Sequence, residues 1–404
     1  MYCRLIGLGA AGNKAAITAV ENEIMSITQT MLINSTLKDI PADYQNKNGA
    51  NVKQFVGAYG GCGKERNISF DLAQSNLMND SLGLDEFLHV GQDDEAELVI
   101  LVSSTEGGTG SGSVPLIAKF IKDVKGIPVH VFGIAGFEDD VRGMRNTVEF
   151  FKEMQPDFTV ECIKNSKFLS SCNGNKIKAE KEANKEFCKK ISVLMGLQIR
   201  DSEHNIDPTD LLKISTKTEG YMIIETCVFP DKIKNSDYFR QCVIDTLDKS
   251  KALDVDSEAI ERLGIIMNLK SESTDYIDYA DIITERYGVP YEKYEHIQHE
   301  VETMPEFISF IMGGMKMPTE EVEATYENYQ KSVARVNKSA DDFFSTIKEK
   351  SISVDDKKFD FNAEKEKPKM SAADFFKQQA TPAGSFKNTT TRMVSKEVDP
   401  MDEY

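Results

Sequence analysis

Residues 101–120, LVSSTEGGTGSGSVPLIAKF, join a hydrophobic run to an amphipathic segment through a turn rich in glycine. Glycine has no Cβ, so the backbone of such a turn can approach a ligand closely. A helix that begins directly after the turn points free N–H groups and a partial positive charge at the same place. The stretch therefore predicts a site for an anion, most simply a phosphate. A flexible Gly/Ser loop is the alternative.

The same order of hydrophobic run, polar turn and amphipathic segment recurs on both sides of this stretch. Hydrophobic runs end in turns near residues 8, 34 and 136, and residues 55–67 form another turn dense in glycine. Strands that alternate with helices predict a parallel α/β sheet. Ligands bind at the carboxyl ends of the strands in such a sheet, and every glycine turn lies at that end. One shared nucleotide pocket is the simplest interpretation.

The composition limits the classes of partner and the compartment. The chain has 404 residues, of which 40% are hydrophobic, and a formal net charge of −18. This charge disfavours direct binding to DNA or to an anionic membrane. Seven cysteines without a CxxC pair indicate free thiols in a reducing compartment. With no signal peptide and no membrane-spanning apolar run, we expect a cytoplasmic protein.

The pattern changes along the chain and predicts five parts. Residues 1–176 form a nucleotide-binding domain, and residues 177–204 a central helix with its connector. Residues 205–318 form a smaller α+β domain with a second sheet, residues 319–350 a long helix and residues 351–404 a disordered tail. The tail lacks leucine and is dominated by polar and charged residues, so it cannot bury enough apolar surface to order itself.

The long helix carries an apolar seam whose spacing alternates between four and three residues. Such a seam is a narrow stripe that packs on a partner surface. It packs either on its own domain or, at its far end, on a neighbouring subunit. The residues of the seam are Val322, Tyr326, Tyr329, Val333, Val336, Ala340, Phe343 and Ile347. A Phe pair at residues 375–376 in the tail echoes the pair at 343–344 and indicates either a docking peptide or a chance repeat.

With these pieces in order, residues 3–317 resemble the tubulin/FtsZ superfamily of GTP-dependent filament proteins. The resemblance implies a GTPase that polymerises head to tail, with GTP or GDP and Mg²⁺ as cofactors. GGTGSG at 107–112 is similar to the signature loop of the family, although Glu106 stands where a glycine is usual and would place a carboxylate near the phosphates. GLGAAGN at 7–13, INST at 33–36 and GAYGGCG at 57–63 resemble its other phosphate loops.

The resemblance also implies which residues bind the nucleotide. Glu138 and Arg142 correspond to ribose or guanine-edge contacts, Asn165 to a base or ribose contact, and Asn184 to the guanine reader, with Lys185 in place of the usual neighbouring acid. The phosphate contacts implied by the loops are Gly7, Gly9, Ala10, Ala11, Gly12, Asn13, Asn34, Gly60, Gly61, Gly107, Gly108, Thr109, Gly110, Ser111 and Gly112.

The most specific match is NIDPTD at 205–210, which has the NxDxxD pattern of the FtsZ-type activating loop. Asn205, Asp207 and Asp210 would act on the GTP of the next subunit, because two carboxylates can orient and polarise an attacking water. Hydrolysis would then require an interface between subunits. The structural alternative is a turn in which Asp207 caps a helix.

Within the superfamily, the long final helix and the Phe-containing tail look more like the plasmid- and phage-borne TubZ branch than FtsZ. That branch implies DNA segregation, with the tail binding a DNA-bound adaptor. An FtsZ-type cell-division scaffold would instead bind a membrane-anchoring adaptor through its tail. A Rossmann dehydrogenase, based on residues 7–13 alone, is the third hypothesis and predicts NAD binding.

Overall fold

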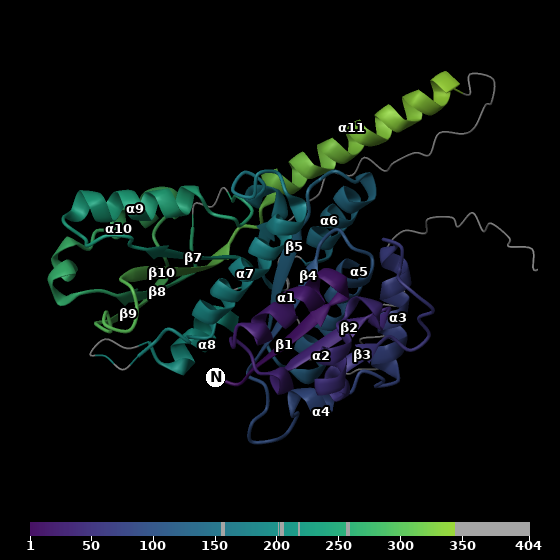
Figure 1. Ribbon diagram of the computed structural model, residues 1–404, viewed down its shortest axis with the longest axis horizontal. Helices are drawn as coiled ribbons and strands as arrows, with labels where there is room; N and C mark the ends of the chain where they lie inside the picture. Colours follow the sequence, from purple (N-terminus) through teal and green to yellow (C-terminus); the bar gives the residue numbers. More distant parts are fainter. Residues whose placement is uncertain (155–157, 201, 203–205, 217–218, 256–258, 344–404) are drawn as a thin grey trace, which may run out of the picture.

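A ten-stranded sheet organises the molecule (Figure 1). The computed structural model describes residues 1–343 apart from 155–157, 201, 203–205, 217–218 and 256–258. The strand order is β3-β2-β1-β4-β5-β6-β7-β10-β8-β9, and the first seven strands in this order are parallel. The strands are β1 (Cys3–Leu8), β2 (Thr30–Asn34), β3 (Val52–Gln54), β4 (Leu98–Ser104), β5 (Val129–Ala135), β6 (Thr159–Lys164), β7 (Gly220–Val228), β8 (Arg262–Asn268), β9 (Glu292–Gln298) and β10 (Phe307–Met315).

The predicted second sheet is not separate from the first. Strand β7 pairs with β6 through only two residue pairs, Thr159 with Gly220 and Val160 with Tyr221. Beyond this short junction, β10 pairs antiparallel with β7 and β8. The strands expected to form a second sheet therefore continue the first one, with a change of direction at the junction.

Helices cover both faces of the sheet because its strands are apolar on both faces. One core contains Leu5 and Ile100 and packs against α1 (Gly9–Glu21) and α7 (Lys176–Leu194). The opposite core contains Ile6 and packs against α3 (Arg66–Met78), α5 (Thr109–Phe120) and α6 (Val141–Met154). The remaining helices are α2 (Ala42–Lys47), α4 (Leu84–Leu88), α8 (Pro208–Thr216), α9 (Ser236–Asp248), α10 (Ala280–Tyr287) and α11 (Thr319–Phe343).

Helix α7 connects strands β6 and β7, where the two parts of the sheet meet, through the buried side chain of Lys190. The Lys190 ammonium lies 2.9 Å from Oε1 of Glu161 on β6 and 2.9 Å from Oε1 of Glu225 on β7. Burial raises the pKa of the Glu161 carboxyl to about 7, although the nearby Lys190 opposes the shift. The charges of both carboxylates raise the pKa of Lys190, although burial acts against them. The narrow β6–β7 junction is thus bridged by an ion triad.

The long helix α11 begins at Thr319, as predicted, and its first turns pack on α6. Val322 is buried, and Tyr326 and Tyr329 are half-buried, so the near end of the seam faces its own domain. Figure 1 shows the helix leaving the body of the molecule beyond this contact. The part of the expected helix and seam beyond Phe343 lies outside the described residues, as does the predicted tail. Across the described part of the chain, no helix combines the length and apolarity needed to cross a membrane.

Candidate nucleotide-binding site

The N-termini of α1 and α5 meet at the carboxyl ends of β1 and β4. Gly9, the first residue of α1, has a φ of +72°, and a Cβ at this position would lie 2.9 Å from the backbone nitrogen of Gly110. Neither helix has a side-chain N-cap. The first N–H groups of a helix need an outside partner, and two adjacent uncapped N-termini make a strong anion site.

The carbonyl groups of the loop at 104–112 are bound from within the protein. Ser69 donates to the carbonyl of Gly108 at 2.7 Å, and Arg66 donates to that of Ser111 at 2.8 Å. Asn146 on α6 donates to the carbonyl of Glu106 at 2.9 Å. With these carbonyl groups engaged from inside, the uncapped N–H groups at the start of α5 are the part of the loop left for a ligand.

The glycines of these loops have two different functions. A Cβ at Gly12 would lie 2.1 Å from the carbonyl oxygen of Val102, and one at Gly108 would lie 2.8 Å from the Cα of Lys64. These two glycines permit close packing between segments of the protein. A Cβ at Gly107 would meet nothing within 4 Å, so this residue borders open space. The motif thus combines tight packing of the loops with room for a ligand.

The loop at 33–36 contacts both the start of α1 and the start of α5. The hydroxyl groups of Ser35 and Thr109 lie 2.9 Å apart, which joins the end of β2 to the start of α5. Asn34 is buried and uses its side chain locally, accepting from the N–H of Ser35. Asn13 donates to the carbonyl of Ile33, and its Oδ1 is buried without a partner among the described residues. A buried acceptor without a partner favours a ligand that can donate a hydrogen bond.

An ion pair joins the loop at 136–142 to the segment directly after the glycine loop at 57–63. Gly60 and Gly61 are exposed, and a Cβ at either would meet nothing within 4 Å. Arg142 pairs with Glu65 at 2.7 Å and donates to the carbonyl of Gly63 at 3.2 Å. The predicted contact residue Arg142 therefore connects the two loops.

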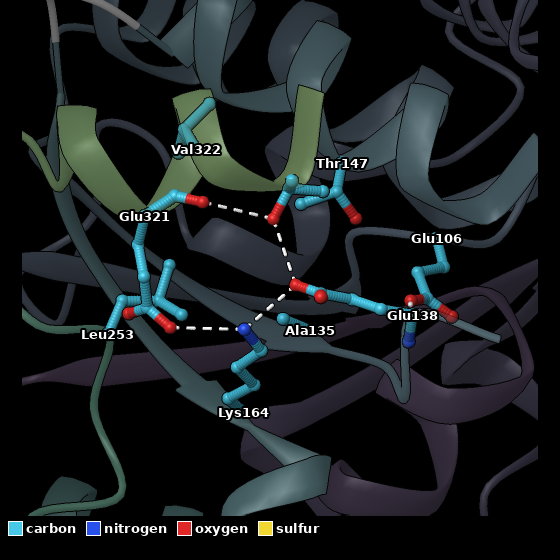
Figure 2. Close-up of a pocket in the computed structure, with 9 residues that line it drawn as sticks. Glu106, Ala135, Glu138, Thr147, Lys164, Leu253, Glu321 and Val322 are labelled. Atoms are coloured by element: carbon cyan, nitrogen blue, oxygen red, sulfur yellow. Dashed lines mark hydrogen bonds and ion pairs between the residues drawn. The ribbon is translucent and has the colours of Figure 1, made fainter. Parts of the chain in front are cut away.

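The side chain of Glu106 lies beneath the loop at 136–142 and not in the glycine loop. Its Oε1 lies 3.4 Å from the N–H of Glu138, and its carboxylate lies against Gly136, beneath the loop at 136–142. Burial raises the pKa of Glu106, although the N–H of Glu138 opposes the shift. Figure 2 shows Glu106 and Glu138 lining one small pocket with Lys164 and Glu321. Gly136 leaves room for this carboxylate, which explains how the chain accommodates it.

The two predicted base readers lie on separate elements. Asn165 directly follows β6 and is buried, and its Oδ1 has no partner among the described residues. Asn184 is half-buried on α7, and the neighbouring Lys185 pairs with Glu182 at 2.8 Å. Asn165 therefore has an unused acceptor at the end of a strand, where a ligand is expected.

The predicted catalytic loop lies at the opposite end of the sheet. Figure 1 places α8 beside the start of β1, whereas the glycine loops lie where β1 ends. The 19-residue helix α7, about 28 Å long at about 1.5 Å per residue, separates the two ends. Asp207 caps α8 by accepting from the N–H of Asp210 at 2.8 Å, and Asp210 pairs with Lys213 at 3.1 Å. Asn205 lies outside the described residues.

The residues around the glycine loops fit a nucleotide better than a bare metal ion. No group of three or more His, Cys, Asp or Glu side chains among the described residues could hold a metal. Mg²⁺ usually keeps several waters and is bound largely through substrate phosphates. The N–H donors of the helix N-termini suit the phosphates of a nucleotide, and Mg²⁺ would be held mainly by those phosphates.

Sequence reasoning missed the residues that hold the loops from behind. Arg66, Ser69 and Asn146 belong to no recognised motif, yet each binds a carbonyl of the loop at 104–112. Asn146 carried a usable signal, since it is a polar residue at an apolar position of the amphipathic helix α6. Lys164, which contacts two carboxylates from different parts of the chain, gave no signal.

Known proteins resemble this chain in sequence and in fold. No model of a known protein family matches the chain. The sequence is 26% identical over 206 residues to the tubulin-like protein TubZ of a Clostridium botulinum C phage, a match that covers 50% of this chain and 53% of that protein. The aligned part therefore spans about half the length of this curated relative.

Two solved structures are similar over most of their length. A GTPγS-form protofilament of TubZ from Bacillus thuringiensis superposes with a TM-score of 0.67 and 15% identity, covering 85% of this chain and 94% of the TubZ chain. A GTPγS-bound protofilament of CetZ2 from Haloferax volcanii gives a TM-score of 0.64 and 17% identity, covering 83% and 100% of the two chains.

The chain thus has the fold of the TubZ and CetZ2 protofilament structures. In sequence, about half of the chain is similar to a phage TubZ.

Proposed function

We propose that this protein is a GTPase that polymerises head to tail and hydrolyses GTP at the interface between subunits. The observation that carries the proposal is the pair of uncapped helix N-termini at the ends of β1 and β4, together with the unpartnered Oδ1 atoms of Asn13 in α1 and Asn165 at the end of β6. The solved TubZ and CetZ2 protofilaments that share the fold contain GTPγS, which supports a guanine nucleotide and self-association.

In this proposal the two ends of the subunit have complementary tasks. The glycine loops bind the phosphates of GTP and its Mg²⁺, which would neutralise charge on the β- and γ-phosphate oxygens. Asp207 and Asp210 lie too far away to reach the nucleotide of their own subunit. In a head-to-tail polymer they would meet the γ-phosphate of the adjacent subunit and orient the attacking water.

We further propose that the filaments position or segregate plasmid or phage DNA in the bacterial cytoplasm. The similarity to a phage TubZ supports this role over the FtsZ-type division scaffold. The negative charge of the chain favours contact with DNA through an adaptor, for which residues 351–404 are the proposed docking segment.

Electron microscopy of the purified protein tests the proposal. We expect filaments with GTP and longer-lived filaments with GTPγS, both in the presence of Mg²⁺, and no filaments without nucleotide. A protein that binds GTP but stays monomeric at all concentrations would contradict the polymer. A protein that binds NAD and not GTP would support the dehydrogenase hypothesis instead.

A further inference from the structure

Four side chains from three distant parts of the chain meet in the small pocket of Figure 2. The Lys164 ammonium lies 2.8 Å from Oε1 of Glu138 and 3.1 Å from Oε1 of Glu321 on α11. The hydroxyl of Thr325, also on α11, lies 2.9 Å from the same oxygen of Glu138. The side chains of Lys164, Glu138 and Glu321 are 15%, 24% and 20% exposed, so solvent screens these contacts only in part.

Glu138 needs such contacts because its backbone is unfavourable. Its φ of +56° lies in the left-handed region, which residues other than glycine rarely adopt. Conformations of this kind persist only where surrounding contacts hold them. Burial would raise the pKa of Glu138, yet its contacts with Lys164, Thr325 and Asn328 together outweigh burial and lower the pKa, which keeps the carboxylate ionised. The ion pair and the Thr325 hydroxyl therefore hold the loop at 136–142 in its observed shape.

The loop at 136–142 connects this cluster to the candidate nucleotide site. Asp139 pairs with Lys176 at the start of α7, and Asp140 pairs with Lys64, directly after the loop at 57–63. Arg142 pairs with Glu65 at 2.7 Å. Asp140 and Arg142 thus both contact residues 63–65, Asp139 contacts α7, and Glu138 contacts α11.

The cluster also fixes the first turns of α11. Oε2 of Glu321 accepts from the N–H of Asp254 at 2.6 Å, and Val322 is buried beside the pocket. The same turns pack on α6, which begins at Val141, at the end of the loop at 136–142. The docked position of α11 and the shape of the loop are therefore held by the same four side chains.

We propose that Lys164 is a positioning residue that links the docking of helix α11 to the shape of the nucleotide-contacting loop at 136–142. The inference rests on the proposed function, because it assumes that this loop contacts a guanine nucleotide. Coupling between two sites is reciprocal in binding free energy. Docking of α11 therefore strengthens nucleotide binding, and bound nucleotide stabilises the docked helix.

Equilibrium binding of fluorescent GDP to the full chain, below the concentration of assembly, tests the link. Glu321→Gln and Thr325→Val should each weaken GDP binding about three- to tenfold. Glu327→Gln is the matched control, because Glu327 lies on the same helix and, among the described residues, forms an ion pair with exposed Lys331 alone. The affinity of the Glu327→Gln variant for GDP should stay within about twofold of that of the wild type. Lys164→Arg should retain tight binding, whereas Lys164→Ala should lose it.

Hydrogen exchange of residues 319–326 supplies a readout that a purely structural role would not change. GDP should slow exchange of these residues in the wild type and in Glu327→Gln, but not in Glu321→Gln or Thr325→Val. The proposal is overturned if Glu321→Gln or Thr325→Val binds GDP as tightly as the control. It is equally overturned if GDP leaves α11 exchange unchanged in the wild type. Wild-type protein that binds neither GTP nor GDP would contradict the proposed function itself. Thr325→Val removes no charge and carries the test if Lys164→Ala fails to fold.

Discussion

The backbone N–H of Asp210 donates a 2.8 Å hydrogen bond to Oδ1 of Asp207. Asp207 therefore caps α8 within the single subunit, which is the structural alternative to a catalytic role. The two roles are compatible, because a cap also holds the loop in a defined shape. Substitutions that separate the cap from the carboxylate can distinguish them.

Asp207→Asn removes the charge and keeps a good N-cap, whereas Asp207→Ala removes both. If Asp207 takes part in hydrolysis, both variants and Asp210→Ala should slow phosphate release by about 10²- to 10⁴-fold. Their filaments should be long-lived, while GTP affinity of the free subunit stays nearly unchanged. Phosphate release and filament lifetime, measured on the same samples, check this.

Asn235→Ala is the control, because Asn235 caps α9 by accepting from the N–H of Tyr238. It should lower the free energy of unfolding by about 0.5–2 kcal/mol and leave hydrolysis normal. Asp207→Asn filaments that hydrolyse GTP at the wild-type rate would reduce Asp207 to a cap.

Guanine selectivity should depend on the amide of Asn165, whose Oδ1 has no partner among the described residues. We expect GTP to bind in preference to ATP, because an amide can both donate to and accept from the guanine edge. Asn165→Ala should weaken GTP binding by about tenfold, and comparison with Asn184→Ala shows which amide reads the base. Competition of ATP and GTP against a fluorescent guanine nucleotide measures this. Equal displacement by ATP and GTP in the wild type would refute the selectivity.

The buried triad at the β6–β7 junction should make stability depend on pH through Glu161. Its pKa of about 7 in the folded protein lies above the ordinary value of 4.5. The folded state therefore binds the proton more tightly, so the contribution of Glu161 to stability is present at low pH and is lost as the pH rises toward 7. Relative to Glu161→Gln, the wild-type free energy of unfolding should fall by about 1–3 kcal/mol between pH 4.5 and pH 7. Urea denaturation of both proteins at several pH values tests this, and parallel curves would contradict it.

Removing Lys190 should be more harmful than removing a surface cation. Lys190→Met leaves two buried carboxylates without their partner, which should cost about 3–5 kcal/mol. Lys249→Met is the control, because Lys249 forms an exposed pair with Asp245 and should cost at most about 1 kcal/mol. Denaturant midpoints of the two variants measure the difference. Equal midpoints would show that the triad does not stabilise the junction.

Deletion of residues 351–404 should leave folding, GTP hydrolysis and assembly broadly intact, because their composition cannot support a packed core. The same deletion should weaken binding to the DNA-bound adaptor. Circular dichroism, phosphate release and a pull-down with the adaptor measure the three effects. A truncated protein that fails to fold would show that the predicted boundary is wrong.

The fold was predictable because its main signals are local. Apolar strands that end in glycine turns, such as Gly107–Gly108, predict a parallel sheet with a ligand at the carboxyl ends of its strands. The continuous ten-stranded sheet was not predictable, because only two residue pairs join β6 to β7. A junction of two residue pairs is too short to produce a recognisable hydrophobic pattern in the sequence.

The grouping of the glycine loops at one end of the sheet was predictable from the sequence, whereas the residues that support these loops were not. Glycine loops are recognisable from spacing, whereas the pairing of Lys164 with Glu321 joins residues 157 positions apart. The position of Glu106 depends on the room left by Gly136, which lies on a different strand end. Contacts of this kind are determined by tertiary packing, so the sequence of either segment alone does not reveal them.

The steady rate of phosphate release per subunit, measured across a range of protein concentrations with GTP and Mg²⁺, tests the central claim most directly. Sedimentation of the same samples gives the concentration at which filaments form. Because each active site needs the glycine loops of one subunit and Asp207 and Asp210 of another, the rate per subunit should be very low below this concentration and rise steeply above it. A rate per subunit that stays constant across the assembly threshold would contradict hydrolysis at the interface.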